Sequence, residues 1–286
     1  MDSDRSPTSV TVRAPAKINL HLSVGLPRED GFHDLTTVFH AVGLYDEVTV
    51  SRSDALSCTV TGEGAADVPT DAGNLAVRAV LALAERTRSD AGVAVRIAKG
   101  IPVAGGCAGG SADAAAALRA LSRLWDVEQV EAGMSVGLGA DVPVCVASRP
   151  ARMRGVGEIL DDMPPLPEFS MVLVNPGIGV STQAVFGARV TAFSGALDIP
   201  AGWCGLADFI DWLAHTRNDL EAAALSLCPS IADALAWLRA MPGCQLARMS
   251  GSGATCYGVF AHAPEIGRLP AGWWSSTGLR KAGSAA

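Results

Sequence analysis

The sequence predicts an α+β protein of two domains. Its β-rich segments come in runs with single helical segments between them, without the regular alternation of strand and helix that a parallel α/β sheet requires. The chain has 286 residues, which is more than one ordinary core holds. The proline-rich stretch at residues 161–167 is typical of a linker. We therefore predict one domain over residues 1–162 and a second over residues 163–286.

Hydrophobic periodicity predicts the individual elements. Residues 18–24 alternate apolar and polar side chains strictly, which is the pattern of a half-buried strand. Asn74 is a good N-cap for the amphipathic stretch 75–88, and the Ala- and Leu-rich residues 111–125 predict a further helix. Other strands are expected at residues 9–12, 46–51, 58–61, 93–98, 171–175, 246–249 and 255–260, and other helices near 206–225 and 230–239.

Composition excludes several function classes. There are 22 basic and 29 acidic residues, a net charge of −7, and no basic stripe of the kind that nucleic-acid binding requires. No apolar run of about 18 residues predicts a membrane span, and the first residues do not form a secretory signal. Seven cysteines are scattered singly without a Cys-x-x-Cys pair, so neither a zinc site nor a disulfide framework is expected. The expected compartment is the cytoplasm, with no nucleic-acid or membrane partner.

The strongest motif is the glycine-rich segment at residues 102–113. Its four glycines lead into Ser111 at a predicted helix start, so that backbone N–H groups and the helix dipole can face phosphate oxygens. It is not a Walker A loop, because Ser111 and Ala112 stand where Lys and Ser/Thr belong, and no Gly-x-Gly-x-x-Gly fingerprint occurs. We interpret the segment as an anion-binding loop, with a flexible connector as the alternative.

Two charged residues are candidates for chemistry. Lys17 is one of only three lysines, and it shares the polar side of the 18–24 strand with Asn19. An ammonium there is either a solvated charge or a group that stabilises an alkoxide or a phosphate. Asp141 has small and apolar neighbours, so it is either a helix cap or a working carboxylate.

Two further segments are ambiguous. The small residues at 250–255 form either a second ligand loop or a tight turn between strands. Phe32 and His33 follow a glycine and either stack on and hydrogen-bond a heterocycle or pack in an ordinary way.

Taken together, these segments resemble a known family. Residues 14–20, 102–113 and 250–254 resemble the three signature motifs of the GHMP small-molecule kinases. The segments at 30–33, 138–143, 155–158 and 217–220 resemble the members of that family that act on 4-diphosphocytidyl-2-C-methyl-D-erythritol.

This resemblance implies a two-domain GHMP kinase fold with the active site in the interdomain cleft. The implied reaction is ATP-dependent phosphorylation of the 2-hydroxyl of that substrate, giving the 2-phosphate and ADP in the non-mevalonate isoprenoid pathway. ATP would be the co-substrate and Mg²⁺ the metal, held at Ser111 or directly on the phosphates. The sequence assigns no other metal ligands.

The resemblance also implies roles for single residues. Asp141 matches the general base and Lys17 the group that polarises the hydroxyl, while Asn74 and Lys99 match adenine contacts. The substrate-binding positions are Asn19, Phe32, His33, Thr182 and Phe186, with the two phenylalanines stacking on cytosine. The ATP phosphates would lie on Pro102, Val103, Ala104, Gly105, Gly106, Cys107, Ala108, Gly109, Gly110, Ser111 and Ala112.

Two alternatives stay open from the sequence. Another GHMP kinase, acting on mevalonate, homoserine or a sugar, is disfavoured by residues 30–33 and by Phe186, because those substrates have no base to stack. A non-catalytic ligand-binding relative is disfavoured because Lys17, Asp141 and the glycine loop are all present.

Overall fold

The computed structural model describes residues 7–27, 33–103, 105–155, 157–190 and 197–277. The chain divides into two compact units built from interleaved segments. Unit 1 comprises Met1–Ala16, Leu44–Val103 and Ala108–Ser148, and unit 2 comprises Lys17–Gly43, Ala104–Cys107 and Arg149–Ala286. The predicted domain boundary at 162/163 falls within unit 2 and stays a prediction.

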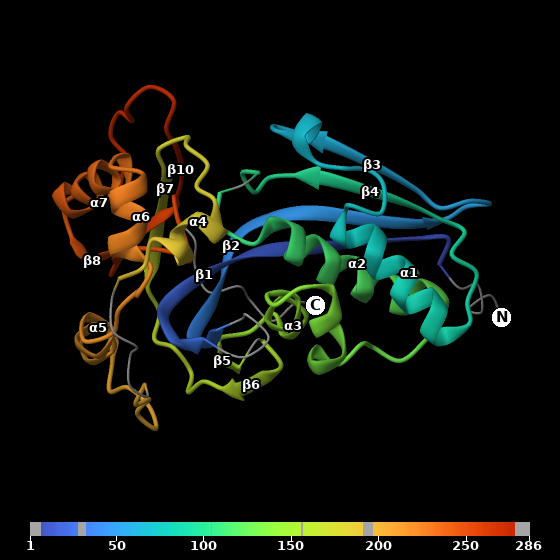
Figure 1. The fold of residues 1–286 in the computed structure, drawn as a ribbon, viewed down its shortest axis with the longest axis horizontal. Coiled ribbons are helices and arrows are strands. Elements are labelled where there is room, and N and C mark those ends of the chain that lie inside the picture. The colour runs from blue at the N-terminus through green and yellow to red at the C-terminus, as the bar shows by residue number, and fades with distance from the viewer. Residues whose placement is uncertain (1–6, 28–32, 104, 156, 191–196, 278–286) are drawn as a thin grey trace. The chain divides into compact units, whose positions relative to one another are not determined.

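In unit 1, helices α1 and α2 lie side by side (Figure 1). The second half of β2 (His33–Arg52) pairs antiparallel with β4, and β4 pairs parallel with β3. Alternate residues of β4 are buried, which is why an alternating sequence folds here as a half-buried strand. The elements of this unit are β3 (Ser57–Gly62), α1 (Leu75–Thr87), β4 (Val93–Lys99), α2 (Gly109–Trp125), α3 (Val142–Ala147) and two short 3-10 helices, Ala65–Asp67 and Ala132–Leu138.

Unit 2 is built on an antiparallel sheet of order β10-β7-β9-β8, against which α7 packs (Figure 1). All six residues of β7 are buried, so this strand lies in the core of the unit. The first half of β2 pairs with β5, and β5 with β6. The elements are β5 (Ala151–Gly155), β6 (Ile159–Asp162), β7 (Ser170–Asn175), α4 (Thr182–Gly187), α5 (Leu206–Ala214), α6 (Glu221–Leu227), α7 (Ser230–Ala240), β8 (Cys244–Met249), β9 (Cys256–Phe260) and β10 (Trp274–Ser276).

Several predicted elements are confirmed, and their signals were local. The side-chain oxygen of Asn74 accepts the N–H of Ala76 at 2.8 Å and caps α1 as expected. The strands expected at 9–12 and 18–24 form parts of one strand, β1 (Ser9–Pro27), and the strand expected at 46–51 lies within β2 (His33–Arg52).

Two predicted elements were wrong, because contacts between residues distant in sequence determine the structure there. Asp161 and Asp162, assigned to a linker, belong to β6, where Asp161 accepts hydrogen bonds from Arg152 and Arg154. The helix expected near 206–225 is two helices, because the segment between α5 and α6 pairs with β1 instead. The N–H of Leu22 donates to the carbonyl of Arg217, and the N–H of Asp219 donates to the carbonyl of Leu22, both at 2.9 Å.

Among the described residues, no single helix is long and apolar enough to cross a membrane. The pair α6 and α7, bent by 119° at the break between them, meets the length and composition test only when the two helices are counted together.

Candidate active site

The part of the glycine loop that lies in unit 2 is held by close contacts with the 250–255 segment and with Lys17. Gly106 has φ +75°, and a Cβ atom on it would lie 2.6 Å from the carbonyl oxygen of Gly253. The hydroxyl of Thr255 donates to the carbonyl of Gly105, and the N–H of Lys17 donates to the carbonyl of Cys107 at 3.3 Å. Only glycine fits at position 106, so the loop is a fixed backbone surface and not a loose connector.

The segment at 250–255 forms the predicted tight turn, and its role as a second ligand loop stays a prediction. It is a tight turn between β8 and β9, since the N–H of Ser250 donates to the carbonyl of Thr255 at 2.9 Å. The same turn supports the glycine loop through Gly253 and Thr255. Asn218 holds the turn in place by donating its amide to the carbonyls of Met249 and Gly251 at 2.9 and 2.8 Å. Asn218 belongs to the segment 217–220 that resembles a family motif, but the sequence alone gives it no role.

The part of the loop in unit 1 runs into the N-terminus of α2. The helix begins at Gly109, and Ala108 before it has φ 53° and makes no side-chain capping hydrogen bond. The first backbone bond of the helix joins the N–H of Ala112 to the carbonyl of Ala108 at 2.9 Å. The N–H groups of Gly109, Gly110 and Ser111 therefore precede the intrahelical ladder, which is the donor arrangement that phosphate oxygens need.

Cys107 is structural in this environment. Its side chain is 1% exposed, and its thiol contacts the carbonyl of Gly105 and the hydroxyl of Thr255 at 3.7 and 3.6 Å. Burial raises the pKa of the Cys107 thiol, which disfavours the reactive thiolate.

Lys99 lies in a buried ion cluster that could not be predicted from the sequence. Its ammonium pairs with Asp46 and, at 2.9 Å, with Asp113, and all three side chains are almost fully buried. The other oxygen of Asp46 accepts the N–H groups of Gly100 and Ile101 at 2.6 and 2.8 Å. The cluster thereby fixes the backbone where β4 leads into the glycine loop and ties it to α2.

The charges of this cluster depend on one another. Burial by itself lowers the pKa of Lys99, but the carboxylates of Asp113 and Asp46 outweigh it and hold that pKa above its ordinary value. Burial and the neighbouring Asp46 raise the pKa of Asp113, against the attraction of Lys99. The ammonium of Lys99 therefore offsets the unfavourable burial of the neighbouring carboxyl groups of Asp46 and Asp113.

Lys99→Met is expected to destabilise the fold by about 3–5 kcal/mol, because it leaves two buried carboxylates without their cation. The free energy of unfolding in urea measures this. The double variant Lys99→Met/Asp113→Asn is the matched control, and it should recover part of the loss because one buried charge is removed. If the single variant is as stable as the parent, the ion cluster does not support this part of the fold.

The side chain of Asn74, the other expected adenine contact, forms hydrogen bonds with residues close to it in sequence. Besides capping α1, its amide donates to the carbonyl of Pro69 at 2.8 Å, and the side chain is buried. Adenine contacts by Asn74 and Lys99 stay predictions.

Lys17 is buried in unit 2, where it is neither a surface charge nor solvated. Its ammonium donates to the side-chain oxygen of Asn19 at 3.1 Å and lies 4.4 Å from the centroid of the Phe39 ring. Asn19 is 3% exposed, and its backbone N–H donates to the hydroxyl of Ser250 at 3.1 Å. The structure thus brings together two of the predicted site residues, Lys17 and Asn19.

Asp141 lies in unit 1 at the first turn of α3 and is partly buried. Its backbone carbonyl accepts the N–H of Cys145 at 3.3 Å, but its carboxylate makes no capping hydrogen bond to the helix. Of the two interpretations of Asp141, the helix cap is therefore not supported.

The predicted substrate contacts are described only in part. Thr182 begins α4, and its hydroxyl lies 2.8 Å from that of Ser252. Phe186, in the same helix, packs partly buried against the core of unit 2. Phe32 and Ala104 lie outside the described residues, as does the side chain of His33.

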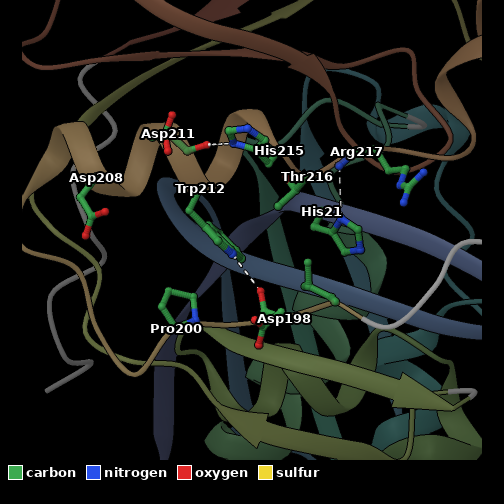
Figure 2. A pocket seen from close by; sticks show the side chains of 10 residues that line it. His21, Asp198, Pro200, Asp208, Asp211, Trp212, His215, Thr216 and Arg217 are labelled. Atoms are coloured by element: carbon green, nitrogen blue, oxygen red, sulfur yellow. Dashed lines mark hydrogen bonds between the residues drawn. The ribbon is translucent and has the colours of Figure 1, made fainter.

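Unit 2 also contains a cavity of about 490 Å³. Within the described part of the chain, none of the predicted site residues lines this cavity. It lies between α5 and the segment around Pro200, and Figure 2 shows Trp212 reaching from the helix to the carbonyl of Asp198. At one wall, the Nδ1 atom of His21 accepts the backbone N–H of Arg217 at 3.3 Å. Within the described part of the chain, the Nε2 atom of His21 is buried without a hydrogen-bond partner.

His21 gives the fold a defined pH dependence. Burial lowers the pKa of its imidazole to about 4, with a further contribution from Arg248. The unfolded chain titrates near 6.5, so the neutral ring stabilises the fold fully above that pH, and this stability is lost as the pH falls towards 4. The loss expected over this range is about 3 kcal/mol.

His21→Leu should therefore show a shallower decline of unfolding free energy between pH 6.5 and 4 than the parent. His215→Gln is the matched control, since His215 lines the same cavity but is exposed. Equal pH slopes in the parent and His21→Leu would contradict a buried neutral His21.

Comparison with known proteins identifies the class. Residues 74–149 match the model of the GHMP kinases N terminal domain, and residues 205–273 match that of the GHMP kinases C terminal domain. The two matches define a GHMP kinase, as the motifs had predicted.

Relatives narrow the class. The chain is 47% identical to a 4-diphosphocytidyl-2-C-methyl-D-erythritol kinase of Jannaschia sp. (strain CCS1), over 91% of this chain and 94% of the relative. A crystal structure of 4-(cytidine 5'-diphospho)-2C-methyl-D-erythritol kinase superposes with a TM-score of 0.73 at 31% identity, covering 96% of this chain and 100% of the other. The homoserine kinase from Cytophaga hutchinsonii has the same fold at 16% identity, with a TM-score of 0.66 and coverage of 91% and 88%. The chain belongs to the 4-diphosphocytidyl-2-C-methyl-D-erythritol kinase family.

Proposed function

We propose that this protein transfers the γ-phosphoryl group of ATP to the 2-hydroxyl of 4-diphosphocytidyl-2-C-methyl-D-erythritol, giving the 2-phosphate and ADP. Beside the family membership, the observation that carries the proposal is the glycine loop, which is fixed by Gly106 and continues into the uncapped N-terminus of α2. Such a loop supplies backbone N–H groups for a chain of phosphates without any rearrangement. We place the reaction in the cytoplasm.

Each proposed role uses a property of its residue. Asp141 accepts the proton of the 2-hydroxyl, and the hydroxyl oxygen forms a bond to the γ-phosphorus as the bond from that phosphorus to the bridging oxygen of ADP breaks. Lys17 stabilises the negative charge that develops on the attacking oxygen. The cytosine would stack on Phe186, with Thr182 and Asn19 as polar contacts.

In this proposal, Mg²⁺ would be bound to the phosphates of ATP. Among the described residues, no group of three or more His, Cys, Asp or Glu side chains is placed to hold a metal ion. Ser111, in the first turn of α2, is the side chain that would reach a metal bound to the phosphates. Mg²⁺ held there would neutralise part of the phosphate charge during transfer.

The experiment is an assay of ADP release by the purified protein with Mg·ATP and the cytidine substrate, with parallel reactions containing mevalonate or homoserine. We expect ADP release with the cytidine substrate alone. ADP release with mevalonate or homoserine would show that the protein is a kinase with a different acceptor. No release from folded, ATP-binding protein would favour a non-catalytic relative. The Asp141→Asn protein, purified in the same way, controls for contaminating kinases.

A further inference from the structure

We infer that Thr37 is a positioning residue, which fixes the amide of Asn19 and through it the ammonium of Lys17. The inference rests on the role proposed for Lys17. Thr37 lies on β2, is fully buried, and belongs to none of the motifs that the sequence analysis identified. Its hydroxyl lies 2.6 Å from the carbonyl oxygen of His21 and 2.8 Å from the side-chain nitrogen of Asn19.

The direction of these hydrogen bonds is forced. A carbonyl oxygen only accepts, so the one proton of the Thr37 hydroxyl must go to His21. The hydroxyl oxygen is then left as an acceptor, and only the NH₂ group of the Asn19 amide can donate to it. Thr37 thereby decides which end of the amide faces it.

The orientation of Asn19 determines what surrounds Lys17. With its NH₂ group on Thr37, the amide presents its oxygen to the ammonium of Lys17 at 3.1 Å and to the hydroxyl of Ser250 at 3.4 Å. The reversed amide would place NH₂ against the ammonium, where both groups are donors. The buried chain of bonds from His21 through Thr37 and Asn19 to Lys17 thus has a single consistent direction.

The same strand supports the ammonium a second time. Phe39, two residues beyond Thr37 on β2, places its ring 4.4 Å from the Nζ atom of Lys17. Strand β2 therefore supports the ammonium directly through the Phe39 ring, and indirectly through Thr37, which orients the amide of Asn19 on β1. A catalytic cation held in this way needs little reorganisation when charge develops on the attacking oxygen.

Thr37→Val tests the inference, because valine keeps the shape and removes the hydroxyl. We expect kcat to fall about 10- to 100-fold with the KM for ATP unchanged, in the range of a displaced electrostatic group. Thr37→Ser keeps the hydroxyl and should restore most of kcat. In a Lys17→Ala background, Thr37→Val should lower kcat by less than twofold, since its effect acts through Lys17.

Two controls separate positioning from loss of folding. Thr216→Val also removes a buried hydroxyl, which donates to the carbonyl of Leu213 at 2.7 Å, and it should lower the unfolding free energy without lowering kcat. The side-chain ¹⁵N–H resonances of Asn19 give a readout without turnover, and they should shift in Thr37→Val but not in Thr37→Ser.

The outcomes are distinguishable. If Lys17→Ala lowers kcat and Thr37→Val does not, the positioning role is wrong and the proposed function stands. An equal loss from Thr37→Val in the parent and in the Lys17→Ala background would also overturn it. If Lys17→Ala leaves kcat unchanged, the proposed role of Lys17 fails and the inference fails with it.

Discussion

Asp141→Asn is expected to remove nearly all turnover, by about 10²–10⁴-fold in kcat, while ATP still binds. The amide has almost the shape of the carboxylate but cannot take the proton of the 2-hydroxyl. The fold should tolerate the change, because the carboxylate does not cap α3. The measurements are kcat from ADP release and the Kd of ATP from calorimetry.

A matched variant tests whether this effect is specific to the site. Asp233→Asn changes an exposed carboxylate on α7, in the C-terminal part of the chain, and should leave both kcat and the Kd of ATP unchanged. Wild-type kcat in Asp141→Asn would show that Asp141 is not the base. Loss of ATP binding together with turnover would make it a structural residue.

Lys17→Ala is expected to lower kcat by about 10²–10³-fold, the cost of removing one preorganised group that stabilises developing negative charge. Asn19 should keep its place in the variant, because its side-chain oxygen still accepts the hydroxyl of Ser250 and its amide still donates to Thr37. The effect should therefore appear in kcat more than in stability.

The measurement is again ADP release, with the unfolding free energy determined in parallel. Lys99→Met is an informative comparison, since it removes another buried lysine and should act mainly on stability. If kcat is unchanged in Lys17→Ala, the ammonium of Lys17 has only a structural role, as the partner of Asn19 and Phe39. The double variant Lys17→Ala/Asp141→Asn adds a further test. If the two groups act in the same step, its loss of transition-state stabilisation should be smaller than the sum of the losses in the two single variants.

Much of the candidate site could be predicted because its signals are local. Glycines at 105, 106, 109 and 110 in front of a helical pattern predict a backbone anion site, and Asn74 before an amphipathic stretch predicts a cap. Both predictions need only contacts between residues that are close in sequence. Position 106 needs glycine for a distant contact as well, since Gly253 excludes a Cβ there, and that contact is not visible in the sequence.

The supporting residues could not be predicted, because their partners are far apart in sequence. Asp46 meets Lys99 across 53 positions, and Ser250 meets Asn19 across 231. Thr37 lies in a β-rich run where a threonine is ordinary, and only the carbonyl of His21 and the amide of Asn19 beside it give it a function. The break between α5 and α6 has the same origin, since β1 takes the hydrogen bonds that a continuous helix would have used.

The sequence by itself determined the class of fold and the family, and it predicted the phosphate loop and the roles of Lys17 and Asp141, because these depend on residue types at fixed spacings. The tertiary structure decided that Lys17 is buried on Asn19 and Phe39, that Lys99 holds two carboxylates, and that Thr37 sets the direction of the hydrogen bonds around Lys17. The physical reason is that a buried polar group is stable only beside its partner, and folding determines which partner it meets.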